Sequence, residues 1–396
     1  MALNLVGKYN TAKVYTDNID QETISQIILL LNQEFAKDSN IRIMPDCHAG
    51  SGCVIGTTMT VTDKIVPNLV GVDIGCGMLA IKIKEHDVDL EKLDAVINTF
   101  VPAGFNIHER KLWQFPLIRD IRAPFDEDYI HRSLGTLGGG NHFIELDKDS
   151  NGDYWLVIHT GSRKLGVSVC EYYQRAGYNK IKNDYQTEKI DVTIAKLKAE
   201  GKHRDIENTI KILKMQAPDI PKDLAYVEGK LMDDYIHDMD ITQEYAYENR
   251  FSIGCIITNK MGWTVDDMCD TKHNYIDTDN MILRKGSISA QKGDRCIIPM
   301  NMRDGSLLCV GKGNSDWNYS APHGAGRIMS RSQAMASLNV DNFKKSMEGI
   351  YSTSVMNSTL DEAPMVYKPM QEIMDNIKDT VDIIDILKPV YNFKAH

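Results

Sequence analysis

The chain has 396 residues, of which 42% are hydrophobic and 25% charged, and these values are typical of a globular protein with a large core. The formal net charge of −10 argues against a general polyanion binder, because nonspecific affinity for nucleic acid comes from clustered lysine and arginine. No apolar run is long enough to span a bilayer and the N-terminal "MALNLVGKYN" lacks the apolar block of a signal peptide, so we expect a cytoplasmic protein.

The first half of the chain alternates between a helical stretch and glycine-rich stretches. Residues 21–36, "QETISQIILLLNQEFA", carry apolar side chains at helical spacing and predict an amphipathic helix. From about residue 43 to 80 glycines and β-branched residues dominate, which predicts short strands joined by tight turns. A second zone of this kind runs from 134 to 166, where "WLVIH" is typical of a buried strand.

The composition of the chain changes at the start of its second half. Residues 168–250 are charged, poor in glycine and periodic, and they predict a helical insertion. Strands and glycine turns are expected again from 251 to 331, and the tail "EIMDNIKDTVDIIDILKPVYNFKAH" is expected to begin as a helix and to end in a short polar segment. No repeat or linker separates these zones, so we predict one α+β domain over residues 1–396 that carries the helical insertion.

The residues able to carry chemistry gather in the glycine-rich zones and the strand region that follows. They are Asp73 and Cys76 in "VGVDIGCGM", Asn141 and His142 in "LGGGNHFIE", His159 in "VIHTGSR", His273 and Asn274 in "TKHNYI", His323 in "PHGAGR", and His48 in "MPDCHAGSG". A single histidine is more often a core residue with a satisfied hydrogen bond. Together these residues favour a ligand site, because glycine lets a ligand approach the backbone closely.

Asp73 and Cys76 are three residues apart, and in a tight turn this spacing can aim a carboxylate and a thiolate at one ion. A mixed set of aspartate, cysteine and histidine suits manganese, iron or zinc better than calcium or magnesium. A closed structural zinc site is the alternative, although such sites usually take cysteine and histidine pairs that are close in sequence. The other cysteines are scattered without a CxxC pair and are expected to be small core residues.

Several cations next to glycine are typical of phosphate contacts. They are Arg163 in "TGSRKLG", Arg284 and Lys285 in "LRKGS", and Arg327 and Arg331 in "HGAGRIMSR". Each alone is more often a solvated surface charge, but they lie in the same turns as the histidines. Standard nucleotide motifs are missing: "GSLLCVGK" has one residue too many for a P-loop, and no K-x-D-G is present.

The series "MPDCHAGSGCVIG", "VGVDIGCGM", "LGTLGGGNHFIE", "HTGSRKLG", "RKGS", "HGAGR" and "DEAPMVYKP" resembles the RtcB family. Members are GTP-dependent RNA ligases that join a 3′-phosphate or 2′,3′-cyclic phosphate end to a 5′-hydroxyl end. The motifs occur in family order from about residue 40 to the C-terminus. The resemblance implies an α+β fold with mixed sheets around a deep metal-lined cleft.

The resemblance also implies site residues. Two manganese ions would be bound by Asp73, Cys76, His142, His159 and His273, with Cys76 between them. His323 would take GMP from GTP. The guanine nucleotide would be cradled by Asn141, His142, Phe143, Ile144, Glu145, His273, Asn274, Pro299, Met300, Asn301, Met302, Ser306, His323, Gly324, Ala325, Gly326 and Lys394. Ser306 and Lys394 follow from the resemblance alone, and His48 is expected beside the site or the RNA end.

By the same resemblance, His323 would carry GMP as a phosphoramidate, pass it to the RNA 3′-phosphate, and a 5′-hydroxyl would then displace GMP. The expected partners are GTP and RNA with 2′,3′-cyclic phosphate or 3′-phosphate and 5′-hydroxyl ends, in tRNA splicing or RNA repair. We expect a monomer with no membrane partner, and an activator protein is a further candidate partner. A metal-dependent RNA end-processing phosphodiesterase without ligation is the alternative. Where many members read "HRKGA", this chain has Leu283 in place of the histidine, at a position expected near the active centre.

Overall fold

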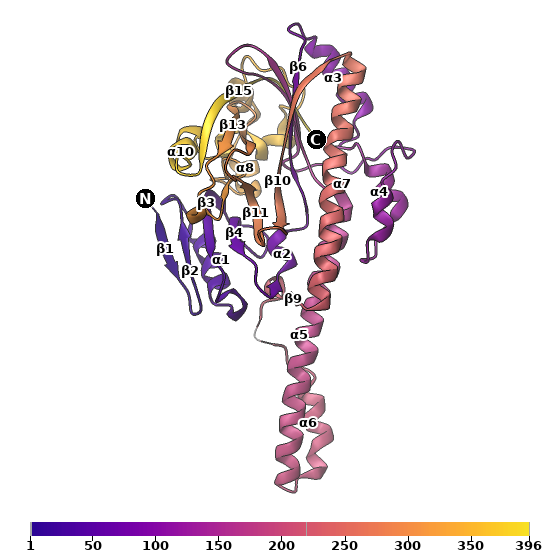
Figure 1. Ribbon diagram of the computed structural model, residues 1–396, viewed down its shortest axis with the longest axis vertical. Coiled ribbons are helices and arrows are strands. Elements are labelled where there is room, and N and C mark those ends of the chain that lie inside the picture. The colour runs from indigo at the N-terminus through magenta and orange to yellow at the C-terminus, as the bar shows by residue number, and fades with distance from the viewer. Residues whose placement is uncertain (1, 219, 396) are drawn as a thin grey trace.

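The computed structural model describes residues 2–218 and 220–395, and its N-terminal part forms one edge of a large sheet (Figure 1). Strands β1 (Leu3–Val6) and β2 (Thr11–Val14) precede helix α1 (Gln21–Leu31) and a 3₁₀ turn at Glu34–Ala36. The Asp20 side chain caps α1 by accepting from the backbone N–H of Thr23 at 2.8 Å. Ile27, Leu30 and Leu31 are buried on one face, which confirms an amphipathic helix over Gln21–Leu31. The predicted end of this helix at residue 36 was wrong, because Glu34–Ala36 forms a separate 3₁₀ turn.

Most of the remaining strands belong to the same 13-stranded sheet. Its path runs β1-β2-β3-β4-β11-β10-β6-β8-β7-β15-β13-β12, with β14 beside β11; β2 and β3 are parallel and the other named neighbours antiparallel. The strands are β3 (Ile41–His48), β4 (Ile55–Thr60), β6 (Gly77–Ile83), β7 (Phe143–Lys148), β8 (Tyr154–Thr160), β10 (Val265–Asp277), β11 (Ile282–Ser289), β12 (Arg295–Asn301), β13 (Gly305–Gly311), β14 (Ser320–Pro322) and β15 (Val381–Lys394). β5 (Lys64–Ile65) and β9 (Val227–Glu228) form a separate pair.

The helices lie mainly beside this sheet, so the α+β class is confirmed. The α-helices are α2 (Pro67–Val70), α3 (Leu90–Phe100), α4 (Glu127–Ser133), α5 (Arg163–Ala199), α6 (Ile206–Leu213), α7 (Lys230–Met261), α8 (Arg331–Ser337), α9 (Val340–Ser346) and α10 (Met370–Asn376). Further 3₁₀ turns occur at Pro116–Asp120, His203–Asp205, Lys222–Leu224, Ser315–Trp317, Asn357–Glu362 and Pro364–Val366. Within the described residues, no helix has both the length and the apolar character needed to cross a membrane.

The helical segment is longer than the predicted 168–250. α5 starts at Arg163 and α7 continues to Met261, so the expectation of strands from residue 251 was wrong for residues 251–261. The reason is packing: Ile253 and Ile257 of α7 are fully buried against the sheet, so this stretch continues the apolar face of the helix. Figure 1 shows α5 and α7 along one side of the molecule, with α6 and the far half of α5 extending as an arm.

The tail also differs from the prediction. Its helix is present as α10, but the residues expected to form a short polar segment are strand β15, which pairs with β13 on one side and β7 on the other. The alternating polar residues of "VDIIDILKPVYNFK" are those of a strand, and Pro389 is accommodated beside a register shift. The pairing with β7 places Lys394 opposite Phe143, next to the histidine-bearing turn.

The candidate residues lie at one end of three neighbouring strands in the middle of the sheet. Cys76 directly precedes β6 and His142 directly precedes β7, while His159 lies in β8 between these two strands. In the register, His159 is opposite Met78 on one side and Phe143 on the other. One face of these strands packs on α3 and α7, while the other faces β12, β13 and the start of the pocket described below. The strand ends therefore bring three sequence-distant turns together.

Candidate metal and nucleotide site

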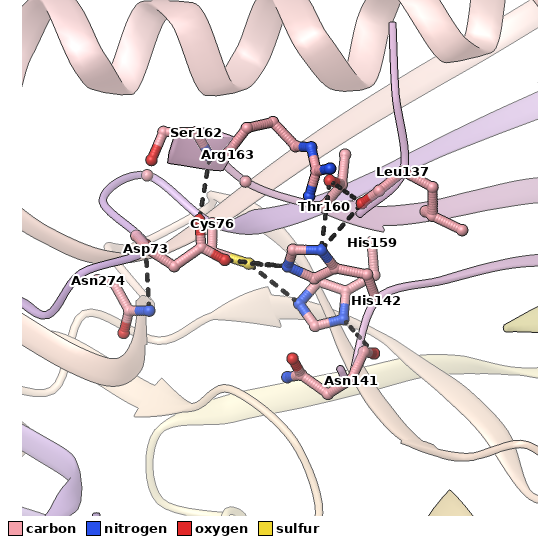
Figure 2. A network of polar contacts seen from close by, with 12 residues as sticks. Asp73, Cys76, Leu137, Asn141, His142, His159, Thr160, Ser162, Arg163 and Asn274 are labelled. Carbon is pink, nitrogen blue, oxygen red and sulfur yellow. Dashed lines mark hydrogen bonds and ion pairs between the residues drawn. The ribbon is translucent and has the colours of Figure 1, made fainter. Parts of the chain in front are cut away.

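Five side chains form a compact and largely buried cluster at these strand ends. Figure 2 shows four of them, Asp73, Cys76, His142 and His159. Two overlapping groups, Asp73 with Cys76 and His142, and Cys76 with His159 and His273, each have their donor atoms within 4.8 Å of one another. The Cys76 Sγ atom lies 3.4 Å from Nε2 of both His142 and His159. Cys76 is thus the shared member, and the structure brings together all five residues that the resemblance names as metal ligands.

Glycines allow this close approach. Gly75 has φ +68, and a Cβ there would lie 2.8 Å from the Cα of Gln243 in α7. Gly161 follows β8, and a Cβ there would lie 2.1 Å from Oδ1 of Asp73. The glycines at these positions are therefore required by the structure, because any side chain there would displace the turn that carries Asp73 and Cys76.

Hydrogen bonds at the outer side of the cluster orient its histidines. His142 Nδ1 lies 2.9 Å from the carbonyl of Leu137, and His159 Nδ1 lies 3.2 Å from that of Asn141. A carbonyl can only accept, so Nδ1 donates in each ring and Nε2 is the nitrogen that faces the cluster. The His142 Nε2 atom lies 2.9 Å from Asp73 Oδ2. A cation can replace the proton in such a contact and bind both atoms.

Charge and burial agree with this arrangement. Burial, reinforced by His142, lowers the pKa of His159 well below its usual value, and burial with the neighbouring His323 does the same for His273. Burial alone would raise the pKa of Asp73, but the hydrogen bond and charge of His142 hold it at about 2. Neutral imidazoles and an ionised carboxylate are the ligand forms that metals need. Burial raises the pKa of Cys76 well above its usual value, so a bound cation is needed for its thiolate.

A buried arginine holds the backbone of two cluster turns. Arg250 of α7 is fully buried and makes a bidentate ion pair with Asp270 at 2.7 and 3.0 Å. Its Nη1 atom donates to the carbonyls of Gly75 and Thr160, at 2.8 and 3.0 Å. These carbonyls adjoin Cys76 and His159, so the arginine ties the two turns to each other.

His323 is held beside the cluster by a residue that the sequence reasoning missed. Its Nδ1 atom lies 2.7 Å from Oδ2 of Asp46, which also accepts from the backbone N–H groups of His323 and Gly324 at 3.1 and 3.2 Å. Asp46 is fully buried. The His323 ring lies 4.9 Å from the His273 ring between centroids. The available signal was the position of Asp46 within "MPDCHAGSG", the motif quoted for His48.

A pocket of about 1040 Å³ opens next to His323. The expected nucleotide residues on its wall are Asn141, Phe143, Glu145, Pro299, Met300, Asn301, Met302, His323, Gly324, Ala325, Gly326 and Lys394. His48 also lines it, and burial lowers the pKa of His48 to about 4, so its ring is neutral near pH 7. The volume lies at the upper end of the range for small-molecule sites.

Other expected nucleotide residues lie around the pocket without lining it. Ile144 is fully buried in the core between the sheet and α7, because alternation along β7 turns it away from Phe143. Asn274 has φ +62, donates to the Asp73 carbonyl at 3.3 Å and accepts from the Gly286 N–H at 2.8 Å. Ser306 is fully buried, and its Oγ atom has no hydrogen-bond partner among the described residues.

The polar floor of the pocket carries both charge signs. Lys394 Nζ lies 2.7 Å from Oε2 of Glu362, and both side chains are almost fully buried. The Asn392 amide donates to Glu145 at 2.5 Å. Burial raises the pKa of Glu145 to about 7, although the Lys394 charge acts in the opposite direction. Glu145 and Lys394 therefore offer a carboxyl group and an ammonium group to a polar ligand in the pocket.

The expected phosphate cations separate into two sets. Arg327 and Arg331 line the pocket, where Arg327 pairs with Glu362 at 3.2 Å and Arg331 with Asp361 at 2.7 Å. Arg284 and Lys285 do not line it, so this prediction was wrong for them. Arg284 is fully buried against Tyr275, Asp277 and Ser320, and Lys285 donates to the Asn68 carbonyl at 2.9 Å.

The structure also places two other residues that the sequence analysis singled out, Arg163 and Leu283. Arg163 lies beside the cluster (Figure 2). It donates to Thr136 Oγ1 at 3.0 Å and to the Gly104 carbonyl at 2.8 Å. Leu283 is 1% exposed and packs in the core with Leu69 and Val70, and it does not line the pocket. The residue in place of the usual histidine is therefore part of the hydrophobic core of this chain.

Comparison with known proteins places this arrangement in context. The profile of the family described as "tRNA-splicing ligase RtcB" matches residues 34–127 and 122–395. The chain is 28% identical to the RNA-splicing ligase RtcB of Escherichia coli over 90% of both chains. It is 26% identical to the tRNA-splicing ligase RtcB of Archaeoglobus fulgidus, over 84% of this chain and 82% of that protein.

Proposed function

The chain belongs to the tRNA-splicing ligase RtcB family and is an RNA ligase, and from this premise we propose how its own residues perform the reaction. It joins RNA ends with a 2′,3′-cyclic phosphate or 3′-phosphate to 5′-hydroxyl ends, in tRNA splicing or RNA repair. His323 carries GMP, which it takes from GTP. The location in the cytoplasm and the monomeric state stay predictions of the sequence, and an activator protein stays a candidate partner.

The observation that carries the proposal is the pair formed by His323 and Asp46. The buried carboxylate accepts the Nδ1 proton at 2.7 Å, so the Nε2 atom keeps its lone pair. No hydrogen bond engages Nε2 within the described residues, and His323 lines the pocket. An imidazole oriented by a buried carboxylate at the wall of a nucleotide-sized pocket is suited to nucleophilic attack on phosphorus.

The pocket supplies the groups that a guanine nucleotide requires. Guanine presents N–H donors on one edge and a carbonyl oxygen beside them. Glu145 would accept from the donors, while Lys394 would donate to acceptors of the nucleotide. Arg327 and Arg331 at the pocket wall would contact phosphate oxygens. The fit to GTP rests on this donor and acceptor set.

The five-residue cluster fits two manganese ions. Asp73, Cys76 and His142 would hold one, and Cys76, His159 and His273 the other, with Cys76 in common. Carboxylate, thiolate and imidazole together suit manganese, iron or zinc better than calcium or magnesium, and the choice of manganese follows from the family resemblance. When bound, the ions supply positive charge that stabilises the negative charge developing on phosphate oxygens. Arg250 holds the turns that carry Cys76 and His159 in place for binding of the ions.

The reaction then follows from the residues. The Nε2 lone pair of His323 attacks the α-phosphorus of GTP, an N–P bond forms, and the bond to pyrophosphate breaks. The positive charge on the imidazole is balanced by Asp46, to which Nδ1–H remains bonded. Where the RNA ends in a 2′,3′-cyclic phosphate, water first breaks the bond from phosphorus to the 2′-oxygen, which leaves a 3′-phosphate and a 2′-hydroxyl. The RNA 3′-phosphate next takes GMP from His323 as the N–P bond breaks, and His323 returns to neutral imidazole. A 5′-hydroxyl attacks the activated RNA end, the RNA phosphodiester forms, and GMP leaves.

Covalent labelling tests the first step. The protein is incubated with α-labelled GTP and Mn²⁺, and acid-labile, alkali-stable label is measured on wild type, on His323→Ala and on His203→Ala, a histidine of the distant arm. Wild type and His203→Ala should label equally and His323→Ala should not. Equal labelling of all three proteins, or no labelling of any of them, would refute the guanylation step.

Product analysis distinguishes ligation from end processing. Two short RNAs are supplied, one ending in a 2′,3′-cyclic phosphate and one beginning with a 5′-hydroxyl, with and without GTP. A joined product that requires GTP supports the proposal. Opening of the cyclic phosphate without joining, independent of GTP, would instead identify an RNA end-processing phosphodiesterase.

A further inference from the structure

One aromatic side chain near the site has no role in the fold. Phe105 is 99% exposed, more than any other large hydrophobic side chain of the described residues; Met215 follows with 85%. Met215 lies just after α6 on the distant arm, whereas Phe105 lies in a turn beside the cluster. Because its ring is not buried, Phe105 contributes almost nothing to the hydrophobic core.

The turn that carries Phe105 is fixed to the site by backbone contacts. The Gly104 N–H donates to the Gly138 carbonyl at 2.8 Å, and the Gly104 carbonyl accepts from Arg163 at 2.8 Å. The Leu137 N–H donates to the Pro102 carbonyl at 2.9 Å, and Ala103 forms a bridge with Gly138. These contacts fix the backbone beside Phe105, so a ligand that stacks on the ring needs to order only its side chain.

The glycine turn at residues 138–140 connects Phe105 to the reacting groups. A Cβ at Gly138 would lie 3.0 Å from Nδ1 of His142, so this glycine touches the cluster. A Cβ at Gly140 would lie 3.6 Å from Nη2 of Arg331, which lines the pocket. Gly104, the neighbour of Phe105, therefore lies at the Gly138 end of this turn, and the half-exposed Arg331 lies at its Gly140 end.

We infer that Phe105 is a stacking platform for one of the terminal bases of the RNA strand whose 3′-phosphate is joined. This rests on the proposed function, which brings a single-stranded RNA 3′ end to His323 and the cluster. Proteins hold unpaired bases by stacking them on exposed aromatic rings and hold the backbone with cations. Phe105 supplies the ring, and Arg331, which also pairs with Asp361 at 2.7 Å and Glu362 at 3.4 Å, is the cation at the other end of the glycine turn. Because every base has a π face, the contact tolerates different RNA sequences.

The test measures RNA binding by fluorescence anisotropy with a short single-stranded RNA ending in a 2′,3′-cyclic phosphate. Phe105→Ala and Phe105→Leu should bind about 5- to 150-fold more weakly than wild type, since leucine is apolar but has no π face. Phe105→Trp should bind at least as well as wild type. Met215→Ala, which also removes an exposed apolar side chain, should bind as wild type. Wild-type affinity of Phe105→Ala, or an equal loss in Met215→Ala, would overturn the inference.

A thermodynamic cycle with abasic RNA identifies the base contact itself. Abasic nucleotides are placed in turn at the last positions of the 3′ end, and each RNA is measured with wild type and with Phe105→Ala. At one position the missing base should weaken binding to wild type but not to Phe105→Ala. If, at every position, the loss of affinity from the missing base and the loss from Phe105→Ala add up, the stacking inference is refuted.

Covalent labelling with GTP separates this inference from the proposed function. Guanylation needs no RNA, so every Phe105 variant should label as wild type. Normal labelling with unchanged RNA affinity would contradict the stacking platform and leave the ligase mechanism intact. Absence of label in wild type would contradict the mechanism, while the binding cycle would still decide the role of Phe105.

Discussion

The Nδ1 atom of His323 lies 2.7 Å from Oδ2 of Asp46, across 277 residues of sequence. The same oxygen accepts two backbone N–H groups at the histidine turn, so it fixes both the ring and the turn that carries it. Asp46 is fully buried, which strengthens the interaction of its charge with an imidazolium. The pair therefore determines the tautomer and the orientation of the proposed nucleophile.

Replacement of Asp46 tests this relationship. Asp46→Ala should slow guanylation of His323 about 10²- to 10⁴-fold, because the imidazole loses its orientation and the balancing charge. The rate of guanylation should fall less in Asp46→Asn, because the asparagine carbonyl oxygen can still accept hydrogen bonds from the backbone N–H groups of the turn. The measurement is single-turnover labelling with α-labelled GTP at saturating concentration. Labelling of Asp46→Ala at the wild-type rate would show that the carboxylate has no part in the step.

A pair of buried cysteines tests the metal assignment. Cys76 and Cys170 are both nearly inaccessible, but only Cys76 belongs to the cluster. Cys76→Ala should abolish ligation and lower the bound Mn²⁺, because both groups lose their shared ligand. Cys170→Ala should keep metal content and activity, with a loss of stability of about 1 kcal/mol. Metal analysis and ligation assays check both, and similar losses in the two variants would contradict the assignment.

Arg250 is expected to link stability to metal binding. Arg250→Met leaves Asp270 without its partner and two turn carbonyls without a donor, so the free energy of unfolding should fall by about 3–5 kcal/mol. Bound metal should fall as well, because Cys76 and His159 adjoin these carbonyls. Urea unfolding and metal analysis provide the measurements.

The control for Arg250 is an exposed ion pair. Arg122 pairs with Asp234 and its side chain is 47% exposed, so Arg122→Ala should cost at most about 1 kcal/mol and leave the metal in place. Equal effects of the two substitutions would mean that burial of Arg250 has no special role.

Glu145 should make stability depend on pH. Burial raises its pKa from 4.5 to about 7 in the folded protein, so the native state binds more protons than the unfolded state between these values. The free energy of unfolding therefore falls as pH rises through this window. Relative to Glu145→Gln, which cannot ionise, wild type should lose about 3 kcal/mol across it.

Urea unfolding at several pH values, without GTP, measures this difference. The comparison with Glu145→Gln removes the contributions of other titrating groups, such as His48, that both proteins share. A difference between the two proteins that stays constant with pH would show that Glu145 keeps its ordinary pKa.

Local sequence was sufficient for elements whose pattern is complete within a few residues. The helix at α1 follows from its apolar spacing and its Asp20 cap, and β8 follows from the continuous apolar run before His159. It was insufficient where burial depends on distant partners. The last turns of α7 and the strand β15 were missed because their apolar faces are completed by other strands of the sheet.

The sequence by itself determined the chemical inventory of this protein: an aspartate, a cysteine and histidines among glycines, in a motif order that resembles one family. Only the tertiary structure decided which groups meet. It brought Asp46 to His323, joined two triads through Cys76, and moved Arg284 and Leu283 into the core. The physical reason is that residue type and spacing specify local conformation, whereas these contacts depend on strand pairing across hundreds of residues and on the buried charges it must satisfy.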